Sequence, residues 1–195
     1  ITSFNVDISM SDSLLLSLDG ENWTTEVAIN QDMIQEISYE EHTNRWSKLI
    51  PISTIGQMDQ SKSRMILYER TSFTATPGGY RLMANRIDNT GFTEKDGYIA
   101  FDLFVRNFSG NEYITGLNKD DEEGIYLNKS SEVIVSSNGV PGTGIENSVR
   151  IAFAQIGRVS GVITNTEIIR GISCTPAADS EVTGICRTDN IWEPN

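Results

Sequence analysis

The 195-residue sequence contains a single histidine, His42, and only two cysteines. Metal centres built from several histidines and pH switches built from histidine clusters are therefore excluded. The chain also lacks a Gly-x-Ser-x-Gly elbow, a Gly-x-Gly-x-x-Gly turn and a Walker-type Gly-Lys-Ser/Thr. Without them, the commonest hydrolase, dinucleotide-binding and nucleoside-triphosphate-binding classes are disfavoured. We expect no enzymatic activity and no cofactor.

Basic residues are also scarce. The sequence has 15 Lys and Arg against 27 Asp and Glu, a formal net charge of −12. Because this charge repels phosphate backbones and anionic membrane surfaces, nucleic acid is not an expected partner. The densest apolar run is Leu14-Leu15-Leu16-Ser17-Leu18, far shorter than the roughly 18 residues that a membrane-spanning helix needs. The sequence starts at Ile1, and we expect that an export signal before it has been removed.

The two cysteines, Cys174 and Cys186, flank a short, largely polar segment with no histidine nearby. A disulfide is the simplest interpretation, and by restricting the unfolded chain it would contribute roughly 2 to 3 kcal/mol to stability. Such a bond persists in oxidising compartments, which favours an extracellular or cell-surface location. The alternative is a pair of free thiols in a cytosolic protein.

Alternating apolar residues predict β-structure at the beginning of the chain. One face of a predicted strand within residues 1–10 carries four apolar side chains: Phe4, Val6, Ile8 and Met10. Residues 14–18 predict a second strand, Asp19-Gly20 a turn and residues 23–29 a third strand, which together would form a meander. Residues 31–58 fit neither a two-residue nor a helical period, so we predict irregular structure there.

Strand patterns continue through the middle of the chain. The clearest covers residues 97–108, whose predicted core face consists of Ile99, Phe101, Leu103 and Val105. Before it, we predict a loop at residues 71–79 and a strand at residues 80–87. After it, short strands are predicted at residues 124–127 and 132–135.

Helix and strand patterns compete at residues 145–159, where we predict a helical turn over residues 145–148 that leads into a strand. Many short strands with Gly and Asn at the joins favour antiparallel pairing over alternating βαβ units. The predicted fold is therefore mainly β. We expect one antiparallel, jelly-roll-like β-sandwich domain over residues 1–195, with one or two short helices.

Acidic residues gather near the middle of the chain, and oxygen ligands in a loop are what calcium requires. The candidate ligands are Asp120, Asp121, Glu122 and Glu123. Their spacing does not match an EF-hand loop, and a solvated charged turn is the ordinary explanation. The three tryptophans are candidates for a sugar- or peptide-binding platform, although core or rim packing is more usual for aromatic residues in a sandwich: Trp23, Trp46 and Trp192.

Three segments together point to a known group of proteins: Leu15-Leu16-Ser17-Leu18-Asp19-Gly20-Glu21-Asn22-Trp23, Gly97-Tyr98-Ile99-Ala100-Phe101-Asp102-Leu103 and Ile191-Trp192-Glu193-Pro194-Asn195. They resemble bacterial secreted surface proteins related to the TasA and camelysin group. The resemblance implies an export signal, a jelly-roll-like β-sandwich and, in some members, polymerisation into extracellular fibres by lending a strand to the next subunit. It also implies a natural chain that continues past these residues. The loop between the two cysteines is not part of the group's common pattern.

We therefore expect a non-catalytic structural or adhesive protein of the cell surface, with copies of itself or other surface proteins as partners. Residues 1–10 are a candidate donor strand, because they alternate and lie at a terminus. The alternative is that this strand pairs within its own chain, as terminal strands commonly do. The competing functions are a carbohydrate- or peptide-binding module, a viral capsid or appendage subunit, and a hydrolase whose carboxylates converge only in the fold.

Overall fold

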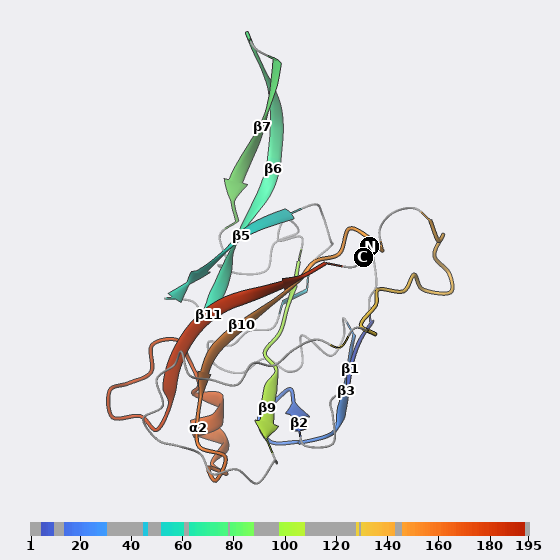
Figure 1. The fold of residues 1–195 in the computed structure, drawn as a ribbon. Helices are drawn as coiled ribbons and strands as arrows, with labels where there is room; N and C mark the ends of the chain where they lie inside the picture. Colours follow the sequence, from blue (N-terminus) through green and yellow to red (C-terminus); the bar gives the residue numbers. More distant parts are fainter. Residues whose placement is uncertain are drawn as a thin grey trace.

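The computed structural model describes residues 5–9, 14–30, 45–46, 52–60, 63–77, 79–87, 98–107, 128, 130–142 and 146–193. Over these residues the protein is mainly β, with one short helix (Figure 1). The strands, in chain order, are β1 (Asn5–Ser9), β2 (Leu14–Ser17), β3 (Glu26–Asn30), β4 (Arg45–Trp46), β5 (Ile52–Asp59), β6 (Arg64–Thr76), β7 (Gly79–Arg86), β8 (Ile99–Ala100), β9 (Phe104–Asn107), β10 (Ile151–Arg158) and β11 (Thr183–Trp192). The helix is α2 (Thr166–Arg170), which precedes β11.

All strand pairings among the described residues are antiparallel. They build small sheets: β1–β3, β2–β9, β4–β8 and β10–β11 have two strands each, and β5–β6–β7 has three. The predicted mainly β, antiparallel fold is therefore confirmed. One short helix is present, but it begins at Thr166, where none was predicted. Of the helical turn predicted over residues 145–148, residues 146–148 form a turn and residue 145 lies outside the described residues.

The N-terminal strands form where they were predicted but pair differently. In β1 the side chains of Val6 and Ile8 are half-buried and their neighbours are exposed, which confirms the alternation for these two residues. β1 pairs with β3 along its whole length, whereas β2 pairs with β9. β2 is linked to the segment just before β3 only by an isolated bridge between Leu16 and Thr24. The predicted meander is wrong for this reason: a local pattern locates a strand, but its neighbour is chosen by packing.

The sheet β5–β6–β7 corrects two predictions. Residues 52–58 are not irregular but belong to β5, whose period is broken by a bulge around Gly56, at a φ of +73°. Residues 71–76 are not a loop but the second half of β6, a segment rich in threonine, which favours strands. Only the turn at Pro77 remains of the predicted loop, and the strand predicted after it is confirmed as β7.

The strand predicted over residues 97–108 is interrupted. β8 pairs with β4 and β9 pairs with β2, while residues 101–103 belong to neither strand. Residues 99–106 are all half-buried, so no core face separates from a solvent face. The predicted core role of Ile99, Phe101, Leu103 and Val105 is therefore wrong, because the two halves of the segment serve different sheets.

Two further predictions concern the second half of the chain. The strand predicted before residue 159 is confirmed as β10, which pairs with β11 through two register shifts. Residues 132–135 do not form a strand, although their side chains alternate between half-buried and exposed. Residues 124–127 lie outside the described residues.

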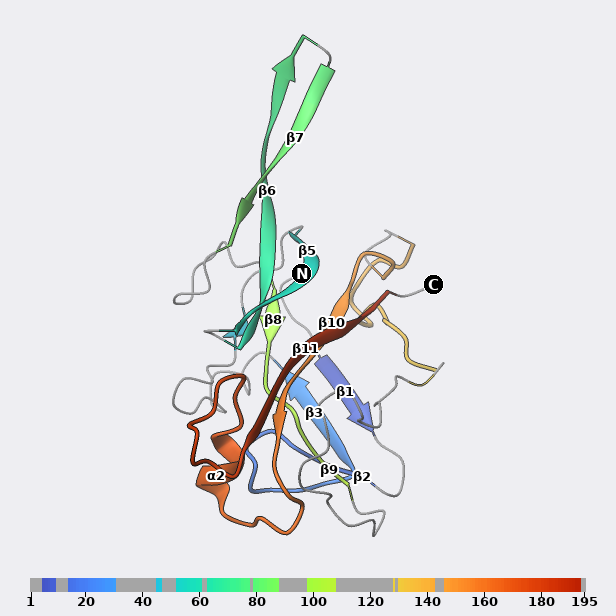
Figure 2. The ribbon, with the colours of Figure 1, turned by 60° about the vertical axis from the view of Figure 1, so that its left-hand side comes forward.

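Among the side chains that the structure describes, few apolar ones are fully buried. Leu16 and Ile29 have exposed fractions of 0% and 1%, and the other buried apolar side chains are Ile87, Tyr98, Ile169, Val182 and Ile185. These residues come from β2, β3, α2, β11 and flanking segments, so much of the core lies in the half of the molecule that holds β2 and α2 (Figure 2). The turn that follows β2 is anchored to this core.

Candidate functional site

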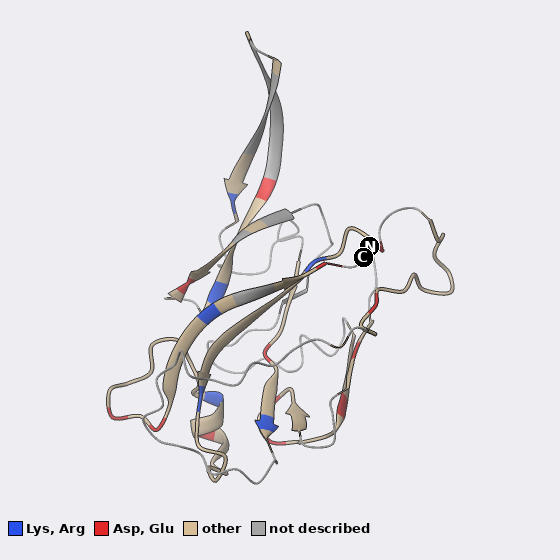
Figure 3. Cartoon of the chain, viewed as in Figure 1, with Lys and Arg blue, Asp and Glu red and all other residues tan. Residues whose placement is uncertain are grey.

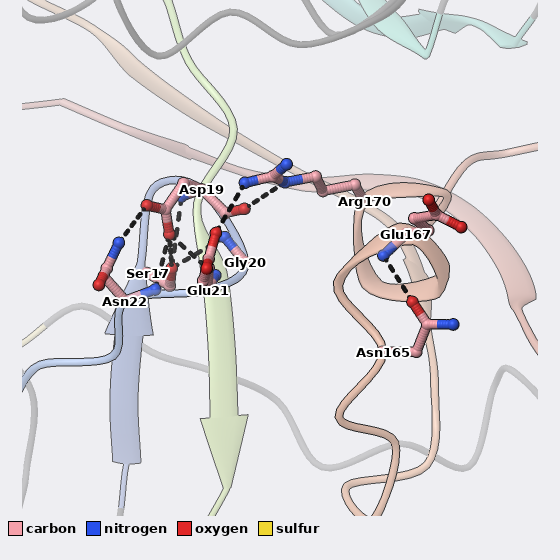
Figure 4. A network of polar contacts seen from close by, with 8 residues as sticks. All are labelled: Ser17, Asp19, Gly20, Glu21, Asn22, Asn165, Glu167 and Arg170. Carbon is pink, nitrogen blue, oxygen red and sulfur yellow. Dashed lines mark hydrogen bonds and ion pairs between the residues drawn. The ribbon is translucent and has the colours of Figure 1, made fainter.

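A compact polar turn follows β2 (Figure 4). Two backbone hydrogen bonds between Leu16 and Thr24, of 2.7 and 2.9 Å, close the turn at its base. Within it, the Asp19 carboxylate accepts hydrogen bonds from the Ser17 hydroxyl at 2.9 Å, from the Glu21 backbone N–H at 2.8 Å, and from the Asn22 backbone N–H and side-chain amide at 2.8 and 2.7 Å. Asp19 thus organises the backbone around itself, as aspartate does in many turns.

These hydrogen bonds favour the charged form of Asp19. Burial alone would raise the pKa of this carboxyl, but the hydrogen bonds from Asn22, Glu21 and Ser17 outweigh burial and lower the pKa from 3.8 to about 2. A carboxylate with four such donors is a structural anion, and it is a poor general acid or base near neutral pH.

The turn packs directly on α2. Gly20 is buried with a φ of +73°, and a Cβ at this position would lie 3.0 Å from the side chain of Ile169. Arg170 donates from Nε to the Asp19 carbonyl oxygen at 2.7 Å and forms a 3.5 Å ion pair with Glu21. The side chain of Asn165 caps the start of α2 by accepting a hydrogen bond from the Glu167 N–H at 2.9 Å.

A shallow cavity of about 210 Å³ lies between the turn and α2. Its lining residues are Gly20, Glu21, Trp23, Arg106, Ile163, Thr164, Thr166 and Ile169. The guanidinium of Arg106 lies over the Trp23 ring, 5.8 Å from its centroid, and donates to the Gly161 carbonyl oxygen at 3.1 Å. Hydroxyl groups, one carboxylate and one guanidinium around a volume of this size suit a small polar molecule.

The predicted disulfide is confirmed. Cys174 and Cys186 are joined, with Cα atoms 5.0 Å apart and a sequence separation of 12. The bond ties the segment after α2 to β11 and encloses a loop whose Asp179 and Glu181 are exposed. Gly184 fits only because it has no side chain, since a Cβ there would lie 2.5 Å from the Cys174 carbonyl oxygen.

The other predicted site residues are only partly described. Val6 and Ile8 of the candidate donor strand lie in β1, whereas Phe4 and Met10 fall outside the described residues. The four candidate calcium ligands also fall outside them: Asp120, Asp121, Glu122 and Glu123. Among the residues that are described, no group of three or more His, Cys, Asp and Glu side chains is placed to hold a metal ion.

Of the tryptophans, Trp23 is half-buried and lines the cavity, Trp192 is half-buried in β11, and Trp46 lies in β4. Sequence reasoning missed Arg106 and the helix α2, which ends at Arg170. Asn165, followed by Thr166 and Glu167, is a recognisable helix start and was the available signal for α2. No local signal indicated that this helix meets the turn after β2.

Comparison with known proteins gave no match to a family model, to a curated protein or to a solved structure. In the described part of the chain, no helix is long and apolar enough to cross a membrane.

Proposed function

We propose that this chain is a non-catalytic structural or adhesive protein of the cell surface, whose copies assemble by lending the N-terminal strand to the next copy. The observation that carries the proposal is the isolated ladder between β1 and β3. It runs from Asn5 opposite Asn30 to Ser9 opposite Glu26, and no third strand among the described residues pairs with either of them. The N-terminal strand is thus held by one short ladder.

The energetics of this ladder suit exchange between copies. Cross-strand pairs contribute roughly 0.2 to 1 kcal/mol each, so the five pairs of β1 and β3 form a contact that can open. If β1 of one copy pairs with β3 of the next, the same backbone hydrogen bonds re-form and Val6 and Ile8 re-enter the same surroundings. Exchange therefore costs little beyond the entropy of association.

The disulfide supports placement outside the cytosol, because a bond of this kind persists in oxidising compartments. The resemblance to secreted surface proteins supports a jelly-roll-like sandwich as the architecture of each subunit. We therefore include this architecture in the proposal: the small sheets are parts of the two facing layers of a sandwich in each subunit.

Removing residues 1–10 tests strand donation. The truncated chain is expected to keep its fold, measured by circular dichroism, and to sediment as a monomer under conditions in which the full chain assembles. A synthetic peptide of residues 1–10 should then bind the truncated chain. The matched control is the same peptide with Val6→Asp and Ile8→Asp, which keeps the backbone but cannot bury the alternating face.

Two outcomes would contradict donation. A truncated chain that unfolds and binds no peptide, alongside a full chain that remains monomeric, indicates that β1 only completes its own subunit. A truncated chain that assembles as well as the full chain shows that β1 has no part in assembly.

A second candidate function follows from the cavity beside Trp23. An exposed tryptophan beside an acidic loop is the arrangement expected of a carbohydrate-binding module. Trp23 is half-buried beside the acidic turn, and the cavity that it lines, of about 210 Å³, has room for roughly one sugar ring. Titration of monosaccharides, followed by tryptophan fluorescence, tests this candidate. Binding that Thr166→Val abolishes would support it. Binding that this substitution leaves unchanged, or no binding at all, would exclude the cavity as a sugar site.

A further inference from the structure

Three Asn-x-Ser/Thr sequences, the acceptor pattern for N-linked glycosylation, begin at Asn22, Asn107 and Asn128. Transfer of a glycan requires that the asparagine amide nitrogen and the hydroxyl group two residues later are both accessible to the transferase. The pattern alone does not rank the three asparagines. Their surroundings in the structure do, because the fold engages them to different degrees.

The first pattern, Asn22-Trp23-Thr24, is engaged inside the polar turn after β2 (Figure 4). The amide nitrogen of Asn22 donates a 2.7 Å hydrogen bond to the carboxylate of Asp19, whose pKa is lowered to about 2 and which is therefore charged at neutral pH. The hydroxyl group of Thr24 donates to the Glu26 carbonyl oxygen at 2.6 Å. A hydrogen bond to a charged acceptor is a strong one, so transfer at Asn22 would have to disrupt the turn.

The second pattern begins in a paired strand. Asn107 is the last residue of β9 and lies opposite Leu14 of β2. The other two residues of this pattern lie outside the described residues. A residue in a strand ladder reaches an enzyme less readily than a residue in an exposed turn, because the ladder must open first.

The third pattern lies in a turn. Asn128 belongs to no strand or helix, and both Asn128 and Ser130 are exposed. The side-chain oxygen of Asn128 accepts a hydrogen bond from the Ser130 backbone N–H at 3.1 Å, and its carbonyl oxygen accepts one from the Ser131 N–H at 3.0 Å. Because the carboxamide is planar, its nitrogen lies on the far side of the group from the Ser130 N–H. Among the described residues, neither this nitrogen nor the Ser130 hydroxyl group has a hydrogen-bond partner.

The chain after this turn is open to solvent. Residues 136–142 are all exposed, and Ile134 has an exposed fraction of 76%. Figure 3 shows residues 130–142 as a loop at the edge of the described structure, away from α2 and from β7. Residues 128–142 contain one basic and one acidic residue, Lys129 and Glu132, so this segment is neutral in a protein with a net charge of −12. It therefore has room for a bulky sugar and does not repel an anionic donor.

We propose that Asn128 is an N-glycosylation site, the acceptor of an oligosaccharide carried on a polyprenyl diphosphate. In the transfer, the amide nitrogen of Asn128 forms a bond with C1 of the first sugar. The bond between C1 and the diphosphate oxygen breaks, the diphosphate leaves with the bonding electron pair, and one amide proton passes to a base of the transferase. Since such transferases act on exported chains, this site rests on the cell-surface location in the proposed function.

The folded chain and three synthetic peptides are compared as acceptors. The peptides contain Asn22, Asn107 or Asn128 with a few residues on either side, and they correct for the intrinsic quality of each pattern. Each acceptor is incubated with a purified single-subunit oligosaccharyltransferase that requires only Asn-x-Ser/Thr and with a polyprenyl-diphosphate-linked oligosaccharide, and mass spectrometry measures the rate at each asparagine. At Asn128 the folded chain should react nearly as fast as its peptide. At the other two asparagines it should react at least about tenfold more slowly than the peptides, because the hydrogen bonds and the ladder must open first.

A variant of the hydroxyl group provides a second test. Ser130→Ala keeps Asn128 and removes only the hydroxyl group that the transferase recognises, so modification at Asn128 should be lost. The matched control is Ser137→Ala, the same substitution at an exposed serine outside any Asn-x-Ser/Thr pattern, which should be modified like the wild type. Circular dichroism verifies that both variants are folded.

Modification of the folded chain at Asn22 or Asn107 as fast as at Asn128, each relative to its peptide, would overturn the proposed site. No modification at Asn128, in the folded chain or in its peptide, would also overturn it. Failure of this site and failure of strand donation are distinguishable, because transfer does not depend on self-association. A chain that is modified at Asn128 but never assembles would contradict strand donation alone, and a chain that assembles but is not modified would contradict glycosylation alone.

Discussion

The Nε atom of Arg170 lies 2.7 Å from the carbonyl oxygen of Asp19, which stands 151 residues earlier in the chain. The bond joins the only helix of the described residues to the turn after β2, and Gly20 packs on Ile169 beside it. Because the Asp19 carboxylate holds the turn and the Asp19 carbonyl holds the helix, one residue organises both sides of the cavity. Disturbing the turn should therefore affect the whole body of the molecule.

Replacement of Gly20 by alanine should be strongly destabilising. The left-handed φ of +73° and the 3.0 Å approach of the new Cβ to Ile169 act together, and we expect a loss of about 2 to 4 kcal/mol in the free energy of unfolding. Chemical denaturation measures this loss. The control is Gly142→Ala, where φ is +75° but nothing lies within 4 Å, so only the backbone cost of about 1 to 2 kcal/mol applies. Equal losses for the two variants would show that the contact with Ile169 carries no weight.

Stability should fall in acid because of Asp19. The folded-state pKa of about 2 lies below the ordinary value of 3.8, so the stabilisation is fully present above about pH 4 and is lost as the pH falls towards 2. Asp19→Asn removes the titrating group, and the variant should lose less stability than the wild type across this window. Denaturation midpoints measured from pH 5 to about pH 2 test this expectation.

A variant that removes only one of the hydrogen bonds to Asp19 provides an intermediate case for the acid experiment. Asn22→Ala removes the 2.7 Å side-chain donor but keeps the backbone donor to Asp19. Its pH dependence should therefore lie between those of the wild type and Asp19→Asn. Identical slopes for all three proteins would mean that other carboxyl groups control acid unfolding.

The disulfide should contribute to stability through the unfolded chain. Replacing Cys174 and Cys186 by serine should lower the free energy of unfolding by about 2 to 3 kcal/mol, as expected for a loop with a separation of 12 residues. Intact mass spectrometry should show the wild type to be lighter than the reduced chain by the mass of two hydrogen atoms. Full alkylation of both thiols without a reductant, in protein purified from an oxidising source, would contradict the bond.

Local patterns in the sequence predicted those parts of the fold that depend on neighbouring residues. The alternation in β1, the strand β10 and the pairing of two lone cysteines are examples. The β5 strand escaped prediction because the bulge at Gly56 shifts its period, and Thr188 of β11 covers that bulge by donating to the Gly56 carbonyl oxygen. A contact between residues 56 and 188 leaves no trace in a local pattern.

In the candidate site, too, some features follow from local sequence patterns and others depend on contacts that only the fold creates. Asp19-Gly20 was a predictable turn, because both residues favour turn conformations. The cavity beside it depends on Arg106 and on α2, which only the fold brings together. The segment containing Phe101 was predicted as the central core strand, but its two halves join different sheets, and strand pairing of that kind is decided by tertiary packing.

The distribution of stability should follow the buried core and not the strongest sequence pattern. Leu16 has an exposed fraction of 0%, so Leu16→Ala should leave a cavity and cost about 2 to 5 kcal/mol. Phe101 is half-buried and lies outside any strand, so Phe101→Ala should cost less than Leu16→Ala although it removes the larger side chain. Both losses are measured by denaturant unfolding at neutral pH. The ranking matters more than either value, since a greater loss for Phe101→Ala would show that Phe101 contributes more to the core than Leu16, contrary to their exposed fractions.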